Sequence, residues 1–358
     1  MDISSGFNNT VLKQNNRGLV YKLIATSDGI SRTELAEASG LTKMAVSYIV
    51  AEFLEKGLVV ETEYTGQRKL PRKPVMLRLS QNCPNIAGVL VHRNYIAAVL
   101  CDCQLNVLRS STIRIQNYSQ DELLEAAFRV TDAVMAGRMV AGIGIGSIGP
   151  VDIANGIILN PPDFFGIQDL PIVQMFRQRY ELPVFLDYHY NCAAMAEKYF
   201  GKGQTYRNFL FLGITEGLGM GIVADNKLYS GFTGLSSEIG HVCIDRNGPL
   251  CSCGNRGCMG SYLNFNSEEG ILSSMECLAI GMAGICNQLN PEAIIVGDEL
   301  ARLQDAHLQV LEDQLNQRLL SKHYRRVKIV RSYRCKDLEA SSCAMNVICR
   351  IFDGSVPL

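Results

Sequence analysis

The chain has 358 residues, of which 47% are hydrophobic and 19% are charged, and its formal net charge is −1 at pH 7. This length is enough for two or three domains with full-sized cores. The first eighteen residues lack the apolar core of a signal peptide, and no apolar run looks long enough to cross a bilayer. Without an export signal the 13 cysteines indicate reduced thiols or metal ligands, so we expect a cytoplasmic protein.

The first eighty residues predict a helix-turn-helix. Apolar residues at helical spacing within residues 18–28 predict a first helix. Ser31 followed three positions later by Glu34 is the capping-box pattern, which predicts a second helix that ends at Gly40. Thr42 opens a third helix, and the apolar face of that helix consists of Val46, Ile49, Val50, Phe53 and Leu54. Two short helices joined by a glycine turn are typical of the helix-turn-helix motif.

A predicted hairpin completes a winged helix. Residues 58–66 and 74–80 have the composition of two strands, with basic residues crowded between them. Residues 1–80 carry 11 Lys/Arg against 8 Asp/Glu. A basic run alone is as typical of a solvated surface as of a phosphate-contacting one, but after a helix-turn-helix it favours DNA.

The predicted DNA contacts lie on the third helix and on the wing. In this motif the N-terminal part of the recognition helix enters the major groove. Side chains there that face away from the apolar stripe would meet base edges, and they are Thr42, Lys43, Ser47 and Tyr48. Basic side chains that would meet phosphates or the minor groove are Arg32, Arg68, Arg72 and Lys73. The expected partner is double-stranded operator DNA, and a helical domain that binds protein is the alternative.

Residues 83–358 alternate between strand and helix patterns. Residues 86–115 predict three consecutive strands, followed by a helix at 120–137 and a buried strand within 139–152. Residues 183–203 predict a strand and a helix, and residues 208–231 predict a hairpin with a glycine-rich turn. A meander followed by alternating helices and strands, given twice, predicts a duplicated α/β core with a ligand cleft between its halves.

One imidazole and three thiols gather in a loop rich in glycine and proline. They are His241, Cys251, Cys253 and Cys258. Soft thiolates with an imidazole are a complete ligand set for a structural, four-coordinate zinc. Gly254 and Gly257 would let the backbone fold back, so that the three sulfurs reach one ion. Chance clustering of cysteines is the alternative, and three of them within eight positions beside a histidine argue against it.

Three motifs resemble the ROK family of repressors, open reading frames and sugar kinases. They are EIGH at 238–241, GPLCSCGNRGC at 248–258 and GITEGLGMGIV at 213–223, with the helix-turn-helix upstream. Family members with an N-terminal winged helix are sugar-responsive repressors, such as the xylose and N-acetylglucosamine repressors, and members without it are sugar kinases. The resemblance covers nearly the whole chain and implies an actin-like, ribonuclease-H-like ATPase fold for residues 83–358. The winged helix would then be residues 1–80.

The resemblance also implies a kinase machinery that is substituted in this chain. The family's first phosphate turn, Asp-x-Gly-Gly-Thr, is matched here by Leu90, His92, Arg93 and Asn94. The position of the catalytic Asp is His189, and the preceding sugar-contacting Asn is Tyr188. The Glu that follows the last zinc cysteine by two positions is Gly260. Bulky side chains at the first turn block the close backbone approach to phosphate that glycine permits.

The second glycine-rich turn survives, but we interpret it structurally. Gly217, Gly219 and Gly221 are typical of a tight hairpin that needs positive φ. Asp298 stands in place of a glycine on the nucleotide side of the family's cleft. We therefore expect no catalytic residues and no phosphoryl transfer. The alternative is an active sugar kinase with a regulatory DNA-binding arm.

A ligand pocket is implied at the family's sugar site. Glu238 and His241 match family contacts, Asp163 stands where an Asn is common, and His189 could still hydrogen-bond a hydroxyl. In the family the histidine both ligates zinc and lies beside the sugar. Because Tyr188 adds bulk, the ligand class stays open between a hexose, a modified sugar, a phosphosugar and a non-sugar. A vestigial pocket is the alternative.

These features predict a transcriptional regulator, a repressor whose effector domain has lost catalysis. We expect a homodimer, because two-fold operators need two-fold proteins. The segment between Cys258 and Pro291 is shorter than the resemblance implies, so the family's dimer geometry is not carried over. An adaptor that binds protein through the actin-like domain is a third hypothesis.

Overall fold

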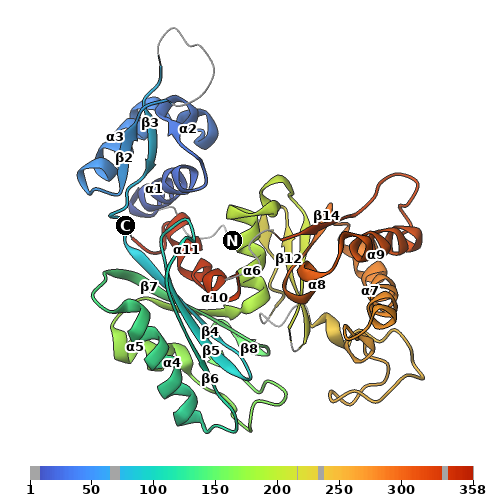
Figure 1. Cartoon of the computed structure of the whole chain (residues 1–358). Helices are drawn as coiled ribbons and strands as arrows, with labels where there is room; N and C mark the ends of the chain where they lie inside the picture. The colour runs from blue at the N-terminus through green and yellow to red at the C-terminus, as the bar shows by residue number, and fades with distance from the viewer. Residues whose placement is uncertain (1–8, 65–72, 216, 233–237, 333–337, 358) are drawn as a thin grey trace.

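The computed structural model of the protein describes residues 9–64, 73–215, 217–232, 238–332 and 338–357. Figure 1 shows a small N-terminal unit at one end and two larger α/β lobes, with helices between the lobes. The predicted mixed α/β fold class, a winged helix followed by a duplicated core, is therefore confirmed.

The N-terminal unit is a winged helix. Its elements are α1 (Asn9–Ala25), β1 (Ile30–Ser31), α2 (Arg32–Ser39), α3 (Lys43–Glu55), β2 (Val59–Thr62) and β3 (Met76–Leu79). The capping box is confirmed, because the Ser31 N–H donates to Glu34 Oε2 at 2.8 Å and the Ser31 hydroxyl accepts from the Glu34 N–H at 3.3 Å. Gly40 ends α2 at a φ of 69°, and the Thr42 side chain caps α3.

The wing is a three-stranded sheet in the order β1-β3-β2. β2 and β3 form the predicted hairpin, and the two-residue β1 was not predicted because it is too short to show a period. The hairpin tip, residues 65–72, lies outside the described residues, and so do the predicted contacts Arg68 and Arg72.

The first lobe is a five-stranded sheet in the order β10-β7-β4-β5-β6. Its strands are β4 (Asn85–Val91), β5 (Tyr95–Cys101), β6 (Val107–Arg114), β7 (Val140–Ser147) and β10 (Val184–Tyr188). The first three strands are antiparallel, whereas β7 and β10 run parallel to β4. The helices and the small hairpin that accompany this sheet are α4 (Gln120–Met135), α5 (Ile172–Tyr180), β8 (Val151–Asp152) and β9 (Ile157–Ile158).

The second lobe is a five-stranded sheet in the order β13-β12-β11-β14-β15. Its strands are β11 (Phe209–Ile214), β12 (Leu218–Ala224), β13 (Lys227–Leu228), β14 (Ala293–Val296) and β15 (Lys328–Arg331). Its helices are α7 (Glu268–Leu289), α8 (Asp298–Arg302) and α9 (Asp305–Arg318), with 3-10 turns η1 (Lys202–Thr205), η2 (Ile239–His241) and η3 (Met259–Tyr262).

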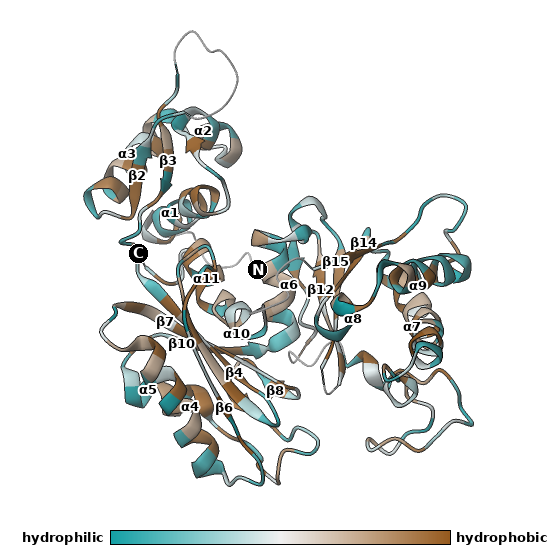
Figure 2. Cartoon of the chain, viewed as in Figure 1, coloured by the Kyte–Doolittle hydropathy of each residue, from teal (hydrophilic) through white to brown (hydrophobic). Residues whose placement is uncertain are grey.

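Both sheets have the same strand order, which confirms the predicted duplication. In each lobe a three-stranded antiparallel meander is followed by two strands parallel to its first strand. Alternate residues of β11 serve different cores: Phe209 and Phe211 join the core of the first lobe, and Leu210 and Leu212 join that of the second. The apolar strands at the centre of both lobes are visible in Figure 2.

Three helices lie between the lobes and the N-terminal unit: α6 (His189–Phe200), α10 (Leu338–Cys343) and α11 (Met345–Phe352). α6 packs against β11 and β12 of the second sheet, and α10 packs against β4 and β5 of the first. Tyr21 of α1 contacts Phe352 of α11, with ring centroids 6.4 Å apart, and its hydroxyl donates to Cys83 Sγ at 3.3 Å. The predicted segments 1–80 and 83–358 therefore share a continuous apolar core at this joint.

One helix corrects the expectation about apolar runs. By length and composition α7 is apolar enough to cross a membrane, although the sequence analysis found no such run. Its Met275, Leu278 and Met282 are fully buried in the core of the second lobe, and it packs against α9. A core helix of a globular domain passes the same test, and these contacts identify α7 as one.

Candidate functional site

A cavity of about 280 Å³ opens between the two lobes. The first lobe lines it with residues that follow β4 and β7 and with the start of α6, and the second lobe lines it with the turn after β11 and the loop around η2 and η3. The four predicted ligand residues all lie on its wall: Asp163, His189, Glu238 and His241. The structure therefore brings together residues that are up to 78 positions apart in the chain.

His189 lines this cavity and carries a buried hydrogen-bond acceptor without a partner among the described residues. The side chain is buried, and its Nδ1 lies 3.0 Å from the carbonyl oxygen of Ser147. Because a carbonyl only accepts, Nδ1 must carry the proton, and Nε2 keeps its lone pair. Burial lowers the pKa of His189 to about 3, so the ring is neutral at pH 7. Among the described residues Nε2 has no hydrogen-bond partner, and a ligand hydroxyl would supply one.

Two tyrosines beside His189 explain the surviving glycines. The Tyr190 ring lies against His189, with centroids 3.9 Å apart. A Cβ added at Gly213 would lie 2.2 Å from the Tyr190 ring, and one at Gly219 would lie 2.2 Å from the ring and from the Tyr188 hydroxyl.

The interpretation of the glycine-rich turn is therefore wrong for two of its three glycines. Gly219 and Gly221 lie within β12 and do not have a positive φ. Gly219 and Gly221 instead give room for the close approach of α6, because any side chain there would collide with it. A sequence pattern cannot distinguish these two demands on glycine, since both leave the same residue type.

Hydrogen bonds cross the cleft beside Tyr190. His92 Nε2 of the first lobe lies 3.3 Å from Thr215 Oγ1 of the second. The Tyr190 hydroxyl lies 3.5 Å from the same Thr215 oxygen and donates to the Gly217 carbonyl at 3.4 Å. These contacts join the two lobes at the inner end of the cavity.

A carboxylate and a guanidinium face the cavity together. Burial raises the pKa of Glu238, while the charges of His241 and Arg93 oppose the rise. Arg93 Nε donates to the carbonyl oxygen of Pro162 at 2.9 Å, which fixes the guanidinium beside the loop that carries Asp163. Arg93 was not predicted as a ligand residue, although its place in the substituted phosphate turn was a usable signal.

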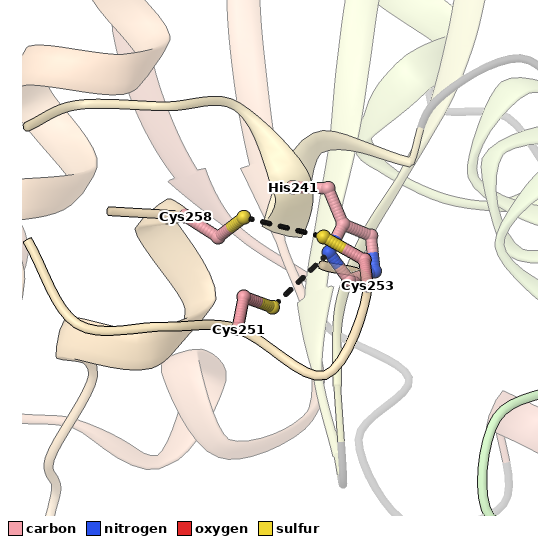
Figure 3. A group of neighbouring side chains, drawn as sticks. All are labelled: His241, Cys251, Cys253 and Cys258. Carbon is pink, nitrogen blue, oxygen red and sulfur yellow. Dashed lines mark hydrogen bonds between the residues drawn. The ribbon is translucent and has the colours of Figure 1, made fainter. Parts of the chain in front are cut away.

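The four predicted metal ligands form one cluster, shown in Figure 3. Their donor atoms all lie within 4.8 Å of one another. Cys251 Sγ lies 3.6 Å from His241 Nδ1, and Cys253 Sγ lies 3.6 Å from Cys258 Sγ. A tetrahedral zinc, with Zn–S of about 2.3 Å and Zn–N of about 2.0 Å, separates its ligand atoms by roughly 3.5–3.8 Å. The cluster could therefore hold a metal ion of that size.

The predicted DNA-facing residues at the start of α3 are exposed. Lys43, Ser47 and Tyr48 are exposed on α3, and Tyr48 keeps 71% of its surface. Thr42 is also exposed, but its hydroxyl accepts the Ala45 N–H at 3.2 Å as the helix cap. It is thus shared between capping and any base contact.

Two predicted basic residues and one unpredicted apolar residue of the winged helix differ in their exposure. Lys73 is exposed, whereas Arg32 is half-buried and paired with Glu61 at 2.8 Å. Met44 is 83% exposed on α3 and was not predicted, because an apolar residue in a helix sequence is more typical of the buried face. An apolar side chain on a recognition helix can contact a thymine methyl group.

Comparison with known proteins shows which families the sequence matches. The sequence profile of the ROK family matches residues 86–275, and a profile for winged helix-turn-helix DNA-binding domains matches residues 15–60. The xylose repressor of Caldicellulosiruptor bescii is 29% identical over 90% of this chain and 92% of its own length.

Two solved structures resemble the fold. A ROK family transcriptional regulator, a homolog of the Escherichia coli MLC protein, has a TM-score of 0.80 and 25% identity over 97% of this chain and 98% of its own. A ROK family glucokinase from Streptomyces griseus, solved with glucose and AMPPNP, has a TM-score of 0.65 and 22% identity over 73% of this chain and 98% of its own. The second likeness concerns the fold alone.

Proposed function

This chain belongs to the ROK family, and from that premise we propose that it is a DNA-binding transcriptional repressor controlled by a sugar or sugar derivative. The winged helix would bind operator DNA, and the cleft between the lobes would bind the effector. The observation that carries the proposal is the combination of an exposed recognition helix with an interlobe cavity on which all four predicted ligand residues lie. Relatives named as xylose repressors support a repressor that responds to a sugar.

DNA recognition would depend on α3 and the wing. Lys43, Ser47 and Tyr48 project from the N-terminal half of α3, where a recognition helix meets base edges. Lys73, with Arg68 and Arg72, would contact phosphates, and such contacts make binding salt-dependent. Arg32 would have to exchange its ion pair with Glu61 for a phosphate.

Phosphoryl transfer is not part of the proposed function. A kinase needs a base that takes a proton from the sugar hydroxyl near neutral pH. The low pKa of His189 makes it a poor base, although its Nε2 keeps a lone pair that could accept a hydrogen bond. Tyr190 also fills the space beside Gly213 and Gly219, where a phosphate would need close backbone approach.

We further propose that the metal cluster holds a structural zinc. His241, Cys251, Cys253 and Cys258 offer one nitrogen and three sulfurs at spacings that fit a tetrahedral ion. The Cys251 thiol already has a pKa lowered to about 6, chiefly because the Cys253 N–H hydrogen-bonds to it. Zinc would fix the loop and the orientation of the His241 ring. His241 also lines the cavity.

A short series of contacts would carry the effector signal to the winged helix. α6 begins at His189 in the cavity and ends beside Phe352 of α11, where Tyr199 lies with its ring centroid 5.3 Å away. Phe352 also contacts Tyr21 of α1. If effector binding shifts α6, the packing of α1 against α11 changes as well. The distance between the two recognition helices of a dimer would then change.

The active species would be a cytoplasmic homodimer. One winged helix supplies few base contacts, so two copies on a two-fold operator are needed for tight, specific binding. The exposed residues of α3 would be accessible to DNA in each copy.

A gel-shift titration tests the DNA half of the proposal. A duplex from the region upstream of the protein's own gene is titrated at two salt concentrations with the wild-type chain and with Lys43→Ala and Tyr48→Ala. Both variants should bind more weakly, by about 1–3 kcal/mol for a lost base contact. Lys227→Ala, an exposed lysine on β13, is the matched control and should bind like wild type. Equal binding by all four chains would place the interface elsewhere.

A further inference from the structure

A second cavity adjoins the first one. Its volume is about 690 Å³, and its wall includes Asn94, Asn160, Phe165 and Gln168. Arg93 and Asp163 belong to the walls of both cavities. The two cavities therefore share part of one wall, and a ligand that extended past these two side chains would reach the second.

The loop that separates the cavities has an unusual backbone. Phe165 has a φ of 53°, in the left-handed region that bulky residues avoid, and Asp163 of the same loop has a φ of 55°. Such conformations persist only where the surroundings hold them, and they concentrate at ligand sites. The Tyr118 hydroxyl donates to the Arg93 carbonyl at 2.8 Å, and its ring centroid lies 4.6 Å from that of Phe165. The strained loop is thus fixed against the β4–β5 turn.

The second cavity has the chemistry of a carbohydrate subsite. Phe165 keeps 43% of its surface exposed although its ring is packed against Tyr118. Around it lie amides, a carboxylate and a guanidinium, which can donate to and accept from hydroxyl groups. A pyranose ring needs this mixture, because its C–H face is apolar and its rim is polar.

The size of the first cavity sets a limit on what it holds. A cavity of roughly 150 Å³ accommodates one benzene ring, so a volume of 280 Å³ suits one sugar ring with its hydroxyls. The adjoining space is larger and more open to solvent, and a single ring in the first cavity leaves it unfilled.

We propose that the effector is a saccharide of at least two rings, or a glycoside, whose first ring lies in the interlobe cavity and whose second ring lies against Phe165. This inference rests on the proposed sugar-responsive function and specifies the ligand class. In the first cavity a hydroxyl of the first ring donates to His189 Nε2. Arg93 and Asp163, which face both cavities, bracket the linkage between the rings.

Calorimetric titration of the full-length protein with matched sugars tests the inference. The pairs are xylose and xylobiose, glucose and cellobiose, glucose and maltose, and N-acetylglucosamine and its β-1,4 dimer. For at least one pair the disaccharide should bind at least tenfold more tightly than the monosaccharide. Phe165→Ala should abolish that ratio by lowering the disaccharide affinity to that of the monosaccharide, and Gln168→Ala should reduce the ratio. Phe232→Ala, a fully exposed phenylalanine outside both cavities, should change nothing.

The outcomes separate this inference from the function on which it rests. If a monosaccharide binds as tightly as every disaccharide, or if neither variant changes the ratio, the two-ring effector is wrong while the sugar site stands. If no sugar of either size binds, the sugar-responsive function itself is contradicted, and this inference fails with it.

Discussion

In the proposed function, His189 has a binding role without a catalytic one. Its Nδ1 donates to the Ser147 carbonyl oxygen, and its Nε2 keeps a lone pair that has no partner among the described residues. A carboxylate at this place would accept the same hydroxyl and also take its proton. A buried imidazole with a pKa near 3 does only the first. This division of roles is the residue-level basis for a ligand sensor that does not phosphorylate.

The pH dependence of stability should report the burial of His189. Its pKa falls from 6.5 in the unfolded chain to about 3 in the folded one, so the unfolded state binds more protons between these values. Its contribution to stability is fully present above pH 6.5 and is lost as the pH falls toward 3. His189→Gln cannot titrate, so its unfolding free energy should fall less steeply over this range, by about 1.4 kcal/mol for each pKa unit. Parallel curves for the variant and the wild type in urea titrations from pH 7 to 4 would contradict the assignment.

Asp298 should show the opposite sign. Burial, reinforced by the charge of Glu339, raises its pKa from 3.8 to about 8, and its Oδ2 has no hydrogen-bond partner among the described residues. The cost of ionising it is therefore absent below pH 3.8 and fully present above pH 8. Asp298→Asn removes that cost and tolerates the φ of 49° at this position. The gain in melting temperature over wild type should be larger at pH 8.5 than at pH 5. An equal gain at both pH values would show that Asp298 is already ionised at pH 5 in the folded protein.

For single residues, the sequence predicted which side chains line the pocket better than it predicted why a residue type is needed at its position. Asp163, His189, Glu238 and His241 were expected in one pocket, because a resemblance assigns positions without needing coordinates. Arg93 was missed as a ligand residue, because its direction depends on the Pro162 carbonyl of a distant loop. The glycines of β12 were assigned to a turn, because the ring that packs on them belongs to another element.

Among the elements, the loop around His241 joins the proposed metal site to the proposed ligand site. Purified protein should contain about one zinc per chain, and Cys253→Ser should reduce this to near zero and weaken sugar binding through the displaced His241. Cys243→Ser is the matched control, since Cys243 is an exposed cysteine outside the cluster. Inductively coupled plasma mass spectrometry with calorimetry provides both readings. Full zinc content in Cys253→Ser would remove that ligand from the proposed site.

The contact between α1 and α11 is close enough to test by adding one methyl group. A Cβ at Gly18 would lie 2.6 Å from the Phe352 carbonyl oxygen, 2.7 Å from the Gly354 nitrogen and 2.8 Å from the Ile351 oxygen. All three are backbone atoms, so α1 must move, at a cost of about 1–3 kcal/mol for overpacking. Gly18→Ala should therefore lose most of the sugar dependence of DNA binding while sugar binding itself is retained.

A glycine with free space provides the control for this experiment. Gly284 lies within α7 and has nothing within 4 Å of an added Cβ. Gly284→Ala should leave the sugar response intact and stabilise the helix by roughly 0.5–1 kcal/mol. An unchanged sugar response in Gly18→Ala would show that the signal does not pass through this joint.

Element prediction succeeded where local chemistry sets the boundary. The capping residue Ser31, the left-handed Gly40 and the cap Thr42 end or begin helices through contacts within a few residues. It failed for β1, which exists only because β3 pairs with it. It also missed the apolar length of α7, where isolated polar residues such as Ser274 are satisfied within the core and so do not interrupt the helix.

At the scale of the whole molecule, the duplicated sheets place the ligand cavity where the two lobes meet. The helices that end each half, α6 and α10, pack together between the lobes, and α11 carries the contact on to α1. Such an arrangement suits a regulator, because a ligand that draws the lobes together must also shift the helices that seat the winged helix. The sequence predicted the duplication, yet it could not predict this joint, whose contacts connect residues more than three hundred positions apart.

In the proposed function, sugar binding in the cleft controls DNA binding by the winged helix. Fluorescence anisotropy of the upstream duplex, titrated with the full-length protein with and without a saturating saccharide from the calorimetric series, measures this coupling directly. We expect tight, salt-dependent binding that the saccharide weakens five-fold or more, the usual range of an allosteric coupling of about 1–3 kcal/mol. Binding that is identical with and without every bound saccharide, or no stronger than to a scrambled duplex, would contradict the account.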